Sequence, residues 1–189
     1  MTSTQAAFLS LSGRMLIAMP ALEDPNFHKA VVLICEHTPE GALGLIVNRP
    51  VATYTVGQAL AQMGIDCHNP AVAARFIYWG GPVQGEVGSV LHRPLGQWHT
   101  TLAVETTNTG MTVSRDILEA ITQGEGPRDF MLMTGYAGWG EGQLEEEIKE
   151  NTWIVAPFAS EVLFDQRPEL RWEAALDSMG IDREYEGHA

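Results

Sequence analysis

The sequence predicts a fold of the α+β class, and two observations favour that class. Apolar runs of strand length outnumber the segments with helical spacing, and they come in hairpin-like pairs before and between the predicted helices. Of the 189 residues, 45% are apolar and 19% are charged, so a sizeable core is expected. Because no repeat or linker-like shift in composition interrupts the chain, we expect a single domain.

Strand signals dominate the first part of the chain. A flexible polar leader, residues 1–12, precedes the first apolar run at 15–19. Residues 30–36 are β-branched and almost wholly apolar, as in a strand that is buried on both faces. A turn signal at 37–41 joins this run to residues 43–48, and the two runs predict a β-hairpin with a loop of about five residues.

The middle of the chain alternates helix and strand signals. Apolar spacing predicts a helix over 56–63, and Gly64 is a typical C-terminal stop. Residues 76–79 predict a strand that the Gly80-Gly81-Pro82 turn breaks. Residues 83–92 continue as strand, and the glycines within this run indicate a bulge or a strong bend.

The remaining elements follow the same pattern of strands and short helices. Residues 101–105 predict a strand, and residues 114–124 predict a helix with Ser at its N-cap and Gly at its end. A short strand is expected at 153–156, and a last helix at 168–180 begins with Pro in its first turn. Residues 182–189 form a charged tail.

The stretch 135–143, with the sequence GYAGWGEGQ, organises the prediction of a site. An apolar run at 130–133 predicts a buried strand before it, and residues 144–149 predict a helix after it. The density of glycine predicts a loop with positive φ angles or closely packed backbone. Tyr136 and Trp139 would be held in this loop as large amphipathic surfaces.

The charge balance argues against direct DNA binding. The formal net charge is −13, and the 11 Lys and Arg residues are scattered along the chain. A stand-alone DNA-binding protein needs concentrated positive charge, because contacts to phosphates supply most of the non-specific affinity. We interpret the acidity as a source of solubility and charge repulsion.

The N-terminal residues and the apolar runs predict a cytoplasmic protein without a membrane partner. The first residues lack the basic region and apolar core of a signal peptide. Every apolar run is shorter than the roughly 20 residues needed to span a bilayer. Cys35 and Cys67 are the only cysteines, and two in a chain of this length do not make a disulfide scaffold.

Cofactor and metal sites are not expected. The 135–143 stretch could cradle an anion, but its glycine spacing matches neither the dinucleotide fingerprint nor the P-loop. Glu141 and Glu145 also place negative charge at the start of the following helix, where it would repel a phosphate. Cys35 and His37 share one face of a predicted strand, but the spacings of a closed zinc site are absent.

No catalytic residue can be assigned from the sequence. Ser89 lacks the pattern of a nucleophile elbow, and each candidate histidine base is more typical of a surface or half-buried position. Aromatic residues at strand ends and in loops leave two alternatives open, since they could line a pocket or fill a core bent by glycine. These residues are Tyr78, Trp79, Trp98, Tyr136 and Trp139.

Eight segments, taken in order, resemble the AlgH/YqgE family of bacterial proteins. They are GRMLIAMP (13–20), VVLICEH (31–37), EGALGLIVNRP (40–50), GGPV (80–83), LH (91–92), SRDIL (114–118), GYAGW (135–139) and GQLE (142–145). The resemblance runs over residues 13–181. It implies one compact α+β domain with a bent mixed β-sheet, partly barrel-like and surrounded by helices.

The resemblance implies little about activity. Members are largely uncharacterised, and the family name comes from a proposed regulatory role in alginate production that led to the label of transcriptional regulator. It supplies no catalytic residue, cofactor or metal. The family segments and the two glycine-rich corners instead suggest a candidate pocket or partner surface. Its members are Asn48, Arg49, Gly80, Gly81, Pro82, His92, Tyr136, Gly138, Trp139, Gly142 and Gln143.

The sequence therefore predicts a cytoplasmic regulator that acts through a protein or small-molecule partner rather than by binding DNA. The alternative is an enzyme of unrecognised class with a pocket between the 80–82 turn and the 135–143 stretch. In both cases the bends after Trp79 and Met133 would bring neighbouring strand ends into one functional corner. The enzyme further requires convergence of polar groups around a cavity: Asn48, Arg49 or His92 with Gln143 or Tyr136.

Overall fold

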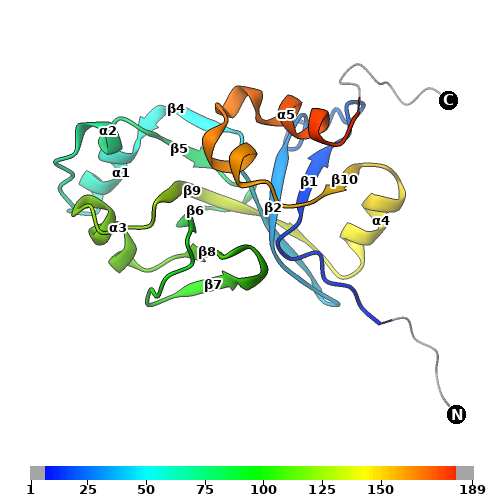
Figure 1. Cartoon of the computed structure of the whole chain (residues 1–189), viewed down its shortest axis with the longest axis horizontal. Helices are drawn as coiled ribbons and strands as arrows, with labels where there is room; N and C mark the ends of the chain where they lie inside the picture. The colour runs from blue at the N-terminus through cyan, green and yellow to red at the C-terminus, as the bar shows by residue number, and fades with distance from the viewer. Residues whose placement is uncertain (1–6, 182–189) are drawn as a thin grey trace, which may run out of the picture.

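A strongly curled, half-barrel β-sheet forms the centre of the molecule, and helices surround it (Figure 1). The computed structural model describes residues 7–181. The strands within that range are β1 (Met15–Ala18), β2 (Val31–Thr38), β3 (Gly41–Ile46), β4 (Pro50–Thr55), β5 (Phe76–Trp79), β6 (Val83–Arg93), β7 (Thr101–Val104), β8 (Thr109–Thr112), β9 (Asp129–Trp139) and β10 (Trp153–Ala156).

The helices are short and lie at the ends and on one face of the sheet. They are α1 (Val56–Gln62), α2 (Pro70–Ala73), α3 (Arg115–Thr122), α4 (Gln143–Lys149) and α5 (Arg171–Ser178), with single turns η1 (Glu105–Thr107), η2 (Glu161–Asp165) and η3 (Pro168–Leu170). In Figure 1, α1, α2 and α3 gather at one end, α4 lies at the other, and α5 lies over β1 and β2.

The sheet is mixed, as expected for the α+β class. Its strand order is β10-β1-β2-β3-β9-β6-β8-β7, and β5 joins it by pairing with both β4 and β9. The pairing of β5 with β9 is parallel, whereas all other pairings are antiparallel. Strand β9 is thus shared by both halves of the sheet, because it contacts β3, β5 and β6.

Alternating side chains divide the core into clusters on the two faces of the sheet. Met15 and Ile17 of β1 pack in the cluster under α5, which also contains Trp172. Leu16 faces the opposite side and packs with Leu144 of α4. Both faces of β1 and β2 are therefore covered, which explains why their sequences are almost continuously apolar. A third cluster joins α1 and α3 to β5, β6 and β9.

The prediction of a loop over 135–143 is wrong for its first five residues. Strand β9 continues to Trp139, and residues 137–139 pair with residues 42–44 of β3. Only 140–142 connect β9 to α4. Glycine weakens a strand in isolation, but the neighbouring strand supplies the backbone partners that hold this segment extended.

Other differences concern short or polar elements. The predicted hairpin is present, but its loop is the pair Pro39-Glu40 rather than about five residues, because the strands extend into polar positions. Strands β4 and β8 and helix α2 have no counterpart in the prediction, since they lack long apolar runs. The charged tail at 182–189 lies outside the described residues.

Two glycines allow the turn after β5 to pack directly against the backbone of β9. Gly135 in β9 has φ +70°, and a Cβ built on it would lie 2.4 Å from the carbonyl oxygen of Gly81. A Cβ on Gly81 would in turn lie 2.2 Å from the carbonyl carbon of Tyr136. No side chain fits between these backbones, so both positions require glycine.

Strand β6 bulges opposite the same glycine. Its residues Val83 and Gly88 pair with Tyr136 and Thr134, so 84–87 lie opposite Gly135 alone. Such an insertion bends the strand and turns side chains out of the plane of the sheet. The bulge that the glycines of 83–92 indicate is therefore present.

No helix within residues 7–181 is long and apolar enough to cross a membrane.

We expect Gly135→Ala to destabilise the protein by about 3 kcal/mol or more, because the substitution adds a clash with backbone to the cost of a positive φ angle. Urea denaturation measures the change. Gly124→Ala is the matched control, since Gly124 has φ +75° and no atom lies within 4 Å of its Cβ position. That variant should lose about 1 kcal/mol. Equal losses in the two variants would show that the backbone contact is unimportant.

Candidate functional site

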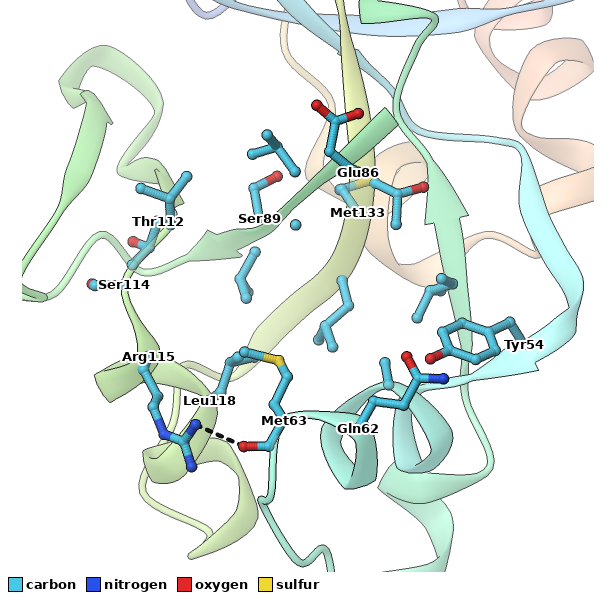
Figure 2. A pocket seen from close by; sticks show the side chains of 18 residues that line it. Tyr54, Gln62, Met63, Glu86, Ser89, Thr112, Ser114, Arg115, Leu118 and Met133 are labelled. Carbon is cyan, nitrogen blue, oxygen red and sulfur yellow. Dashed lines mark hydrogen bonds between the residues drawn. The ribbon is translucent and has the colours of Figure 1, made fainter. Parts of the chain in front are cut away.

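A groove of about 560 Å³ lies between the sheet and two helices, and it is the strongest candidate for a site. Figure 2 shows its side chains, with Glu86 at one end, Arg115 and Met63 at the other, and Tyr54 and Gln62 along one side. Val90 and Leu132 line it from β6 and β9, and Leu118 lines it from α3. The walls are thus apolar and the polar groups lie around them.

The bulge in β6 supplies one wall of the groove. Glu86 and Val87 belong to the residues that lie opposite Gly135, and both line the cavity. Gly88 follows them, and its Cβ position is open apart from the carbonyl oxygen of Met133 at 3.9 Å. This wall therefore depends on the contact between Gly135 and Gly81.

The opposite wall is held by an interaction between α1 and α3. The Arg115 guanidinium donates through Nη1 to the carbonyl oxygen of Met63 at 2.7 Å, shown as a dashed line in Figure 2, and its Nε pairs with Glu119 at 2.9 Å. A capping box between Thr55 and Gln58 fixes the start of α1. Both helices are short, so these contacts set the width of the groove.

The rim of the groove exposes apolar side chains. Met63 is 44% exposed and Val113 is 50% exposed, and both line the cavity. Large apolar side chains that gather at a hollow in the surface are typical of binding sites.

The groove borders a buried network centred on His92. Its Nδ1 lies 3.0 Å from the carbonyl oxygen of Pro94, which can only accept, so Nδ1 carries the proton. Nε2 then accepts from the hydroxyl of Thr112 at 2.7 Å, and Thr112 Oγ1 also lies 2.7 Å from Thr101 Oγ1. Burial lowers the pKa of His92, which favours the neutral ring that this network needs.

This arrangement resembles a nucleophile and its base, but it is closed to substrate. Thr112 is 1% exposed, and His92 is completely buried. The Ser89 hydroxyl is also buried, without a hydrogen-bond partner among the described residues. Burial raises the pKa of the Cys35 thiol to about 12, so that group is inert as a nucleophile.

Asn48 and Arg49 are occupied by the segment before β2. Asn48 accepts from the Val31 amide at 2.9 Å and donates to the Lys29 carbonyl at 2.8 Å. Arg49 donates to the carbonyl oxygens of Pro25 and His28 at 3.1 and 2.6 Å. These two polar side chains hold neighbouring backbone, and neither lines the groove.

The two glycine-rich corners lie side by side, as the sequence indicates, but backbone fills the space between them. Gly80 donates to the Thr134 carbonyl at 2.8 Å, and Gly81 lies against Tyr136. Pro82 is exposed, and the Tyr136 ring packs against the core under α5. The groove lies beside this contact between the two corners, and none of the residues 80–82 or 135–143 lines it.

Trp139 and Gln143 meet in a network around the carboxylate of Glu147. The indole nitrogens of Trp139 and Trp153 donate to Glu147 Oε1 at 3.0 and 2.9 Å, and Gln143 Nε2 donates to Oε2 at 2.8 Å. Gln143 also accepts from the Gly140 amide at 3.0 Å. The network ties β9, α4 and β10 together.

The predicted site residues therefore belong to separate networks. Gly138 and Gly142 are exposed near the Glu147 network, and His92 lies at the far end of β6. The five aromatic residues pack against the core clusters, and two of them, Tyr78 and Trp139, also border cavities. Sequence reasoning did not include the groove residues Glu86, Val87 and Gly88 in the site. The one feature of the sequence that pointed to them was the bulge indicated by the glycines of 83–92.

Metal ligands do not gather at the groove or elsewhere in residues 7–181. No group of three or more His, Cys, Asp and Glu side chains there could hold a metal ion.

Comparison with known proteins gives one consistent result. A family profile described as AlgH-like matches residues 15–184. A UPF0301 protein of Nitrosococcus oceani is 50% identical over 167 residues, which are 88% of each chain. A UPF0301 protein of Methylococcus capsulatus is 46% identical over 95% of this chain and 94% of its own. The solution structure of AlgH from Pseudomonas aeruginosa has a TM-score of 0.77 and 38% identity, covering 99% of this chain and 100% of that one.

We expect Glu147→Ala to lower the free energy of unfolding by about 2–4 kcal/mol, because two indole N–H groups lose a charged acceptor. Glu147→Gln retains one carbonyl acceptor and should lose about half as much. Urea denaturation measures both. Glu146→Ala, an exposed position on the same helix, should change stability by no more than about 0.5 kcal/mol. A loss in the Glu147 variants no larger than in this control would contradict the role of the network.

Proposed function

The chain belongs to the AlgH-like family, and from this premise we propose that it is a cytoplasmic regulator that acts by binding a small, mainly apolar molecule in the groove between the sheet and helices α1 and α3. The observation that carries the proposal is the groove itself, which combines apolar walls with a partly exposed apolar rim.

The size and lining of the groove define the ligand. Its volume of about 560 Å³ falls within the range of about 300–1,000 Å³ that is typical of small-molecule sites. Val90, Leu118 and Leu132 would bury the apolar part of the molecule. Gln62 and Tyr54 stand at the side, where they could hydrogen bond to one polar end.

Binding in the groove would couple to the surface of the protein through α1 and α3. These helices are joined at the groove by the hydrogen bond from Arg115 to the Met63 carbonyl. A ligand that contacts both helices would favour one spacing between them. A protein partner that contacts their outer faces would then distinguish the free and ligand-bound forms.

Direct DNA binding is not part of the proposal. The net charge of −13 leaves the molecule repelled by phosphates over most of its surface. The alternative of an enzyme between the two glycine-rich corners gains no support, because its polar groups lie in separate networks and backbone occupies the space between the corners.

We expect Gly88→Leu to weaken binding of the uncharged fluorophore N-phenyl-1-naphthylamine by at least about tenfold, because the new side chain would occupy the groove. Fluorescence titration measures the dissociation constant. Gly85→Leu is the matched control, since Gly85 lies in the same strand with open space around its Cβ position and does not line the groove.

The control should bind the fluorophore as the unmodified protein does. If both variants bound the fluorophore weakly, or if both bound it as tightly as the unmodified protein, the groove would be excluded as the site. Native mass spectrometry of the protein purified from its own host should also find a small molecule on the unmodified protein and on Gly85→Leu, but not on Gly88→Leu.

A further inference from the structure

A second cavity, of about 610 Å³, lies on the other side of β5 from the groove. Successive residues of a strand point to opposite faces, and β5 shows this alternation. Ile77 lines the groove, whereas its neighbours Phe76 and Tyr78 line the second cavity. The start of β9 and residues of η2, η3 and α5 complete its walls. The two cavities therefore lie on opposite faces of β5, although Leu132 borders both and α1 contributes residues to each.

The second cavity concentrates positive charge in an acidic protein. Arg75, Arg128 and Arg171 line it, although the whole chain has only 11 Lys and Arg residues against 24 Asp and Glu. Two carboxylates also line it, Asp129 and Asp165, and Asp129 pairs with Arg128 at 3.5 Å. The balance at the cavity is thus one positive charge in excess.

Arg171 is the buried member of this set. It is 4% exposed, and no carboxylate oxygen of the described residues lies within 4 Å of its guanidinium. Its Nε donates to the Gln166 carbonyl at 2.8 Å, and its Nη1 donates to the Val47 carbonyl at 2.5 Å. Burial lowers the pKa of Arg171, and both the Tyr78 hydroxyl and the Glu169 carboxylate oppose that shift.

The two carbonyl contacts attach α5 to the residue that follows β3. Among the described residues, the Glu169 carboxylate acts on the Arg171 charge, but from beyond the 4 Å of an ion pair. A buried charge without a counter-ion in direct contact costs free energy, and a bound anion would reduce that cost. Because Nε and Nη1 already donate to Gln166, Val47 and Met131, Nη2 is the guanidinium nitrogen that could donate to a carboxylate or a phosphate.

Aromatic rings lie beside these cations. The Arg75 guanidinium stacks over the Phe130 ring at 4.3 Å from its centroid, and both line the cavity. Phe76 also lines it and is 45% exposed, which is unusual for a phenylalanine. A planar ring in a ligand could stack on Phe76 or on the exposed guanidinium of Arg75.

We propose that this second cavity binds a small aromatic anion, with a phosphate or carboxylate group held by Arg171 and Arg128 and a planar ring packed on Phe76. The site is distinct from the groove and does not depend on its function. Asp165 stands at the same cavity, where it would accept a hydrogen bond from a hydroxyl or amino group of the ligand.

Isothermal titration calorimetry with two probes distinguishes the two head groups. AMP carries a phosphate and a purine, and 4-hydroxyphenylacetate carries a carboxylate and a phenol. We expect at least one of them to bind with a dissociation constant of about 1 mM or tighter. Adenosine, which has the ring without the anion, should bind at least about tenfold more weakly than AMP if the phosphate is the head group.

Variants assign the contacts. Arg171→Lys keeps the charge but loses the planar donors, and it should weaken binding about tenfold or more. Arg128→Gln should weaken it about threefold, because that side chain is exposed. Arg14→Gln is the control, since it removes the same charge from an exposed position that does not line the cavity. Phe76→Ala should weaken binding of the aromatic probe, and it should not enable the protein to bind inorganic phosphate.

Circular dichroism first shows whether Arg171→Lys is folded, and Arg128→Gln and Phe76→Ala decide the question if it is not. Binding that falls in these variants but not in Arg14→Gln supports the site. Failure of both probes to bind would overturn it, and so would binding that is unchanged in Arg128→Gln and Phe76→Ala. Displacement of N-phenyl-1-naphthylamine by the probe would place the anion in the groove and equally contradict the proposal.

Discussion

The contact between Gly81 and Gly135 determines how the two halves of the sheet are joined. Here the turn after β5 and the middle of β9 approach so closely that neither glycine position can carry a side chain. This contact allows β9 to pair with β5 and β6 mainly through its first half and with β3 through its second half. One strand therefore joins both halves of the curled sheet. The contact also places Gly135 alone opposite 84–87, and this bulge forms a wall of the groove. The close backbone contact at Gly135 thus also shapes the groove on the protein surface.

The two faces of β5 carry cavities of different character. The groove is apolar, bordered by α1 and α3, and suited to a molecule that is removed from water mainly by burial of apolar surface. The second cavity is lined by three guanidinium groups and two carboxylates in a protein whose net charge is −13, so its lining has one positive charge in excess. The groove supports the proposed binding of an apolar molecule, and the second cavity supports the proposed anion site.

Much of the fold could be predicted because apolar runs report burial directly. Strand β2, buried on both faces, and the apolar face of α3 belong to this class. The end of β9 could not be predicted, because residues 135–139 are rich in glycine and become a strand only through pairing with β3. The nearness of the two glycine corners could be predicted, but not that backbone would fill the space between them. The partners of Trp139 were also hidden, since Glu147 and Trp153 reach it only in the folded chain.

Backbone amide chemical shifts of ¹⁵N-labelled protein, recorded as N-phenyl-1-naphthylamine is added, would show where the ligand binds. If it binds in the groove, the perturbed amides should cluster at 86–90, at the end of α1 and at the start of α3, which are the three walls of the groove. Perturbations that cluster instead at 80–82 and 135–143, or that scatter over the surface, would contradict binding in the groove.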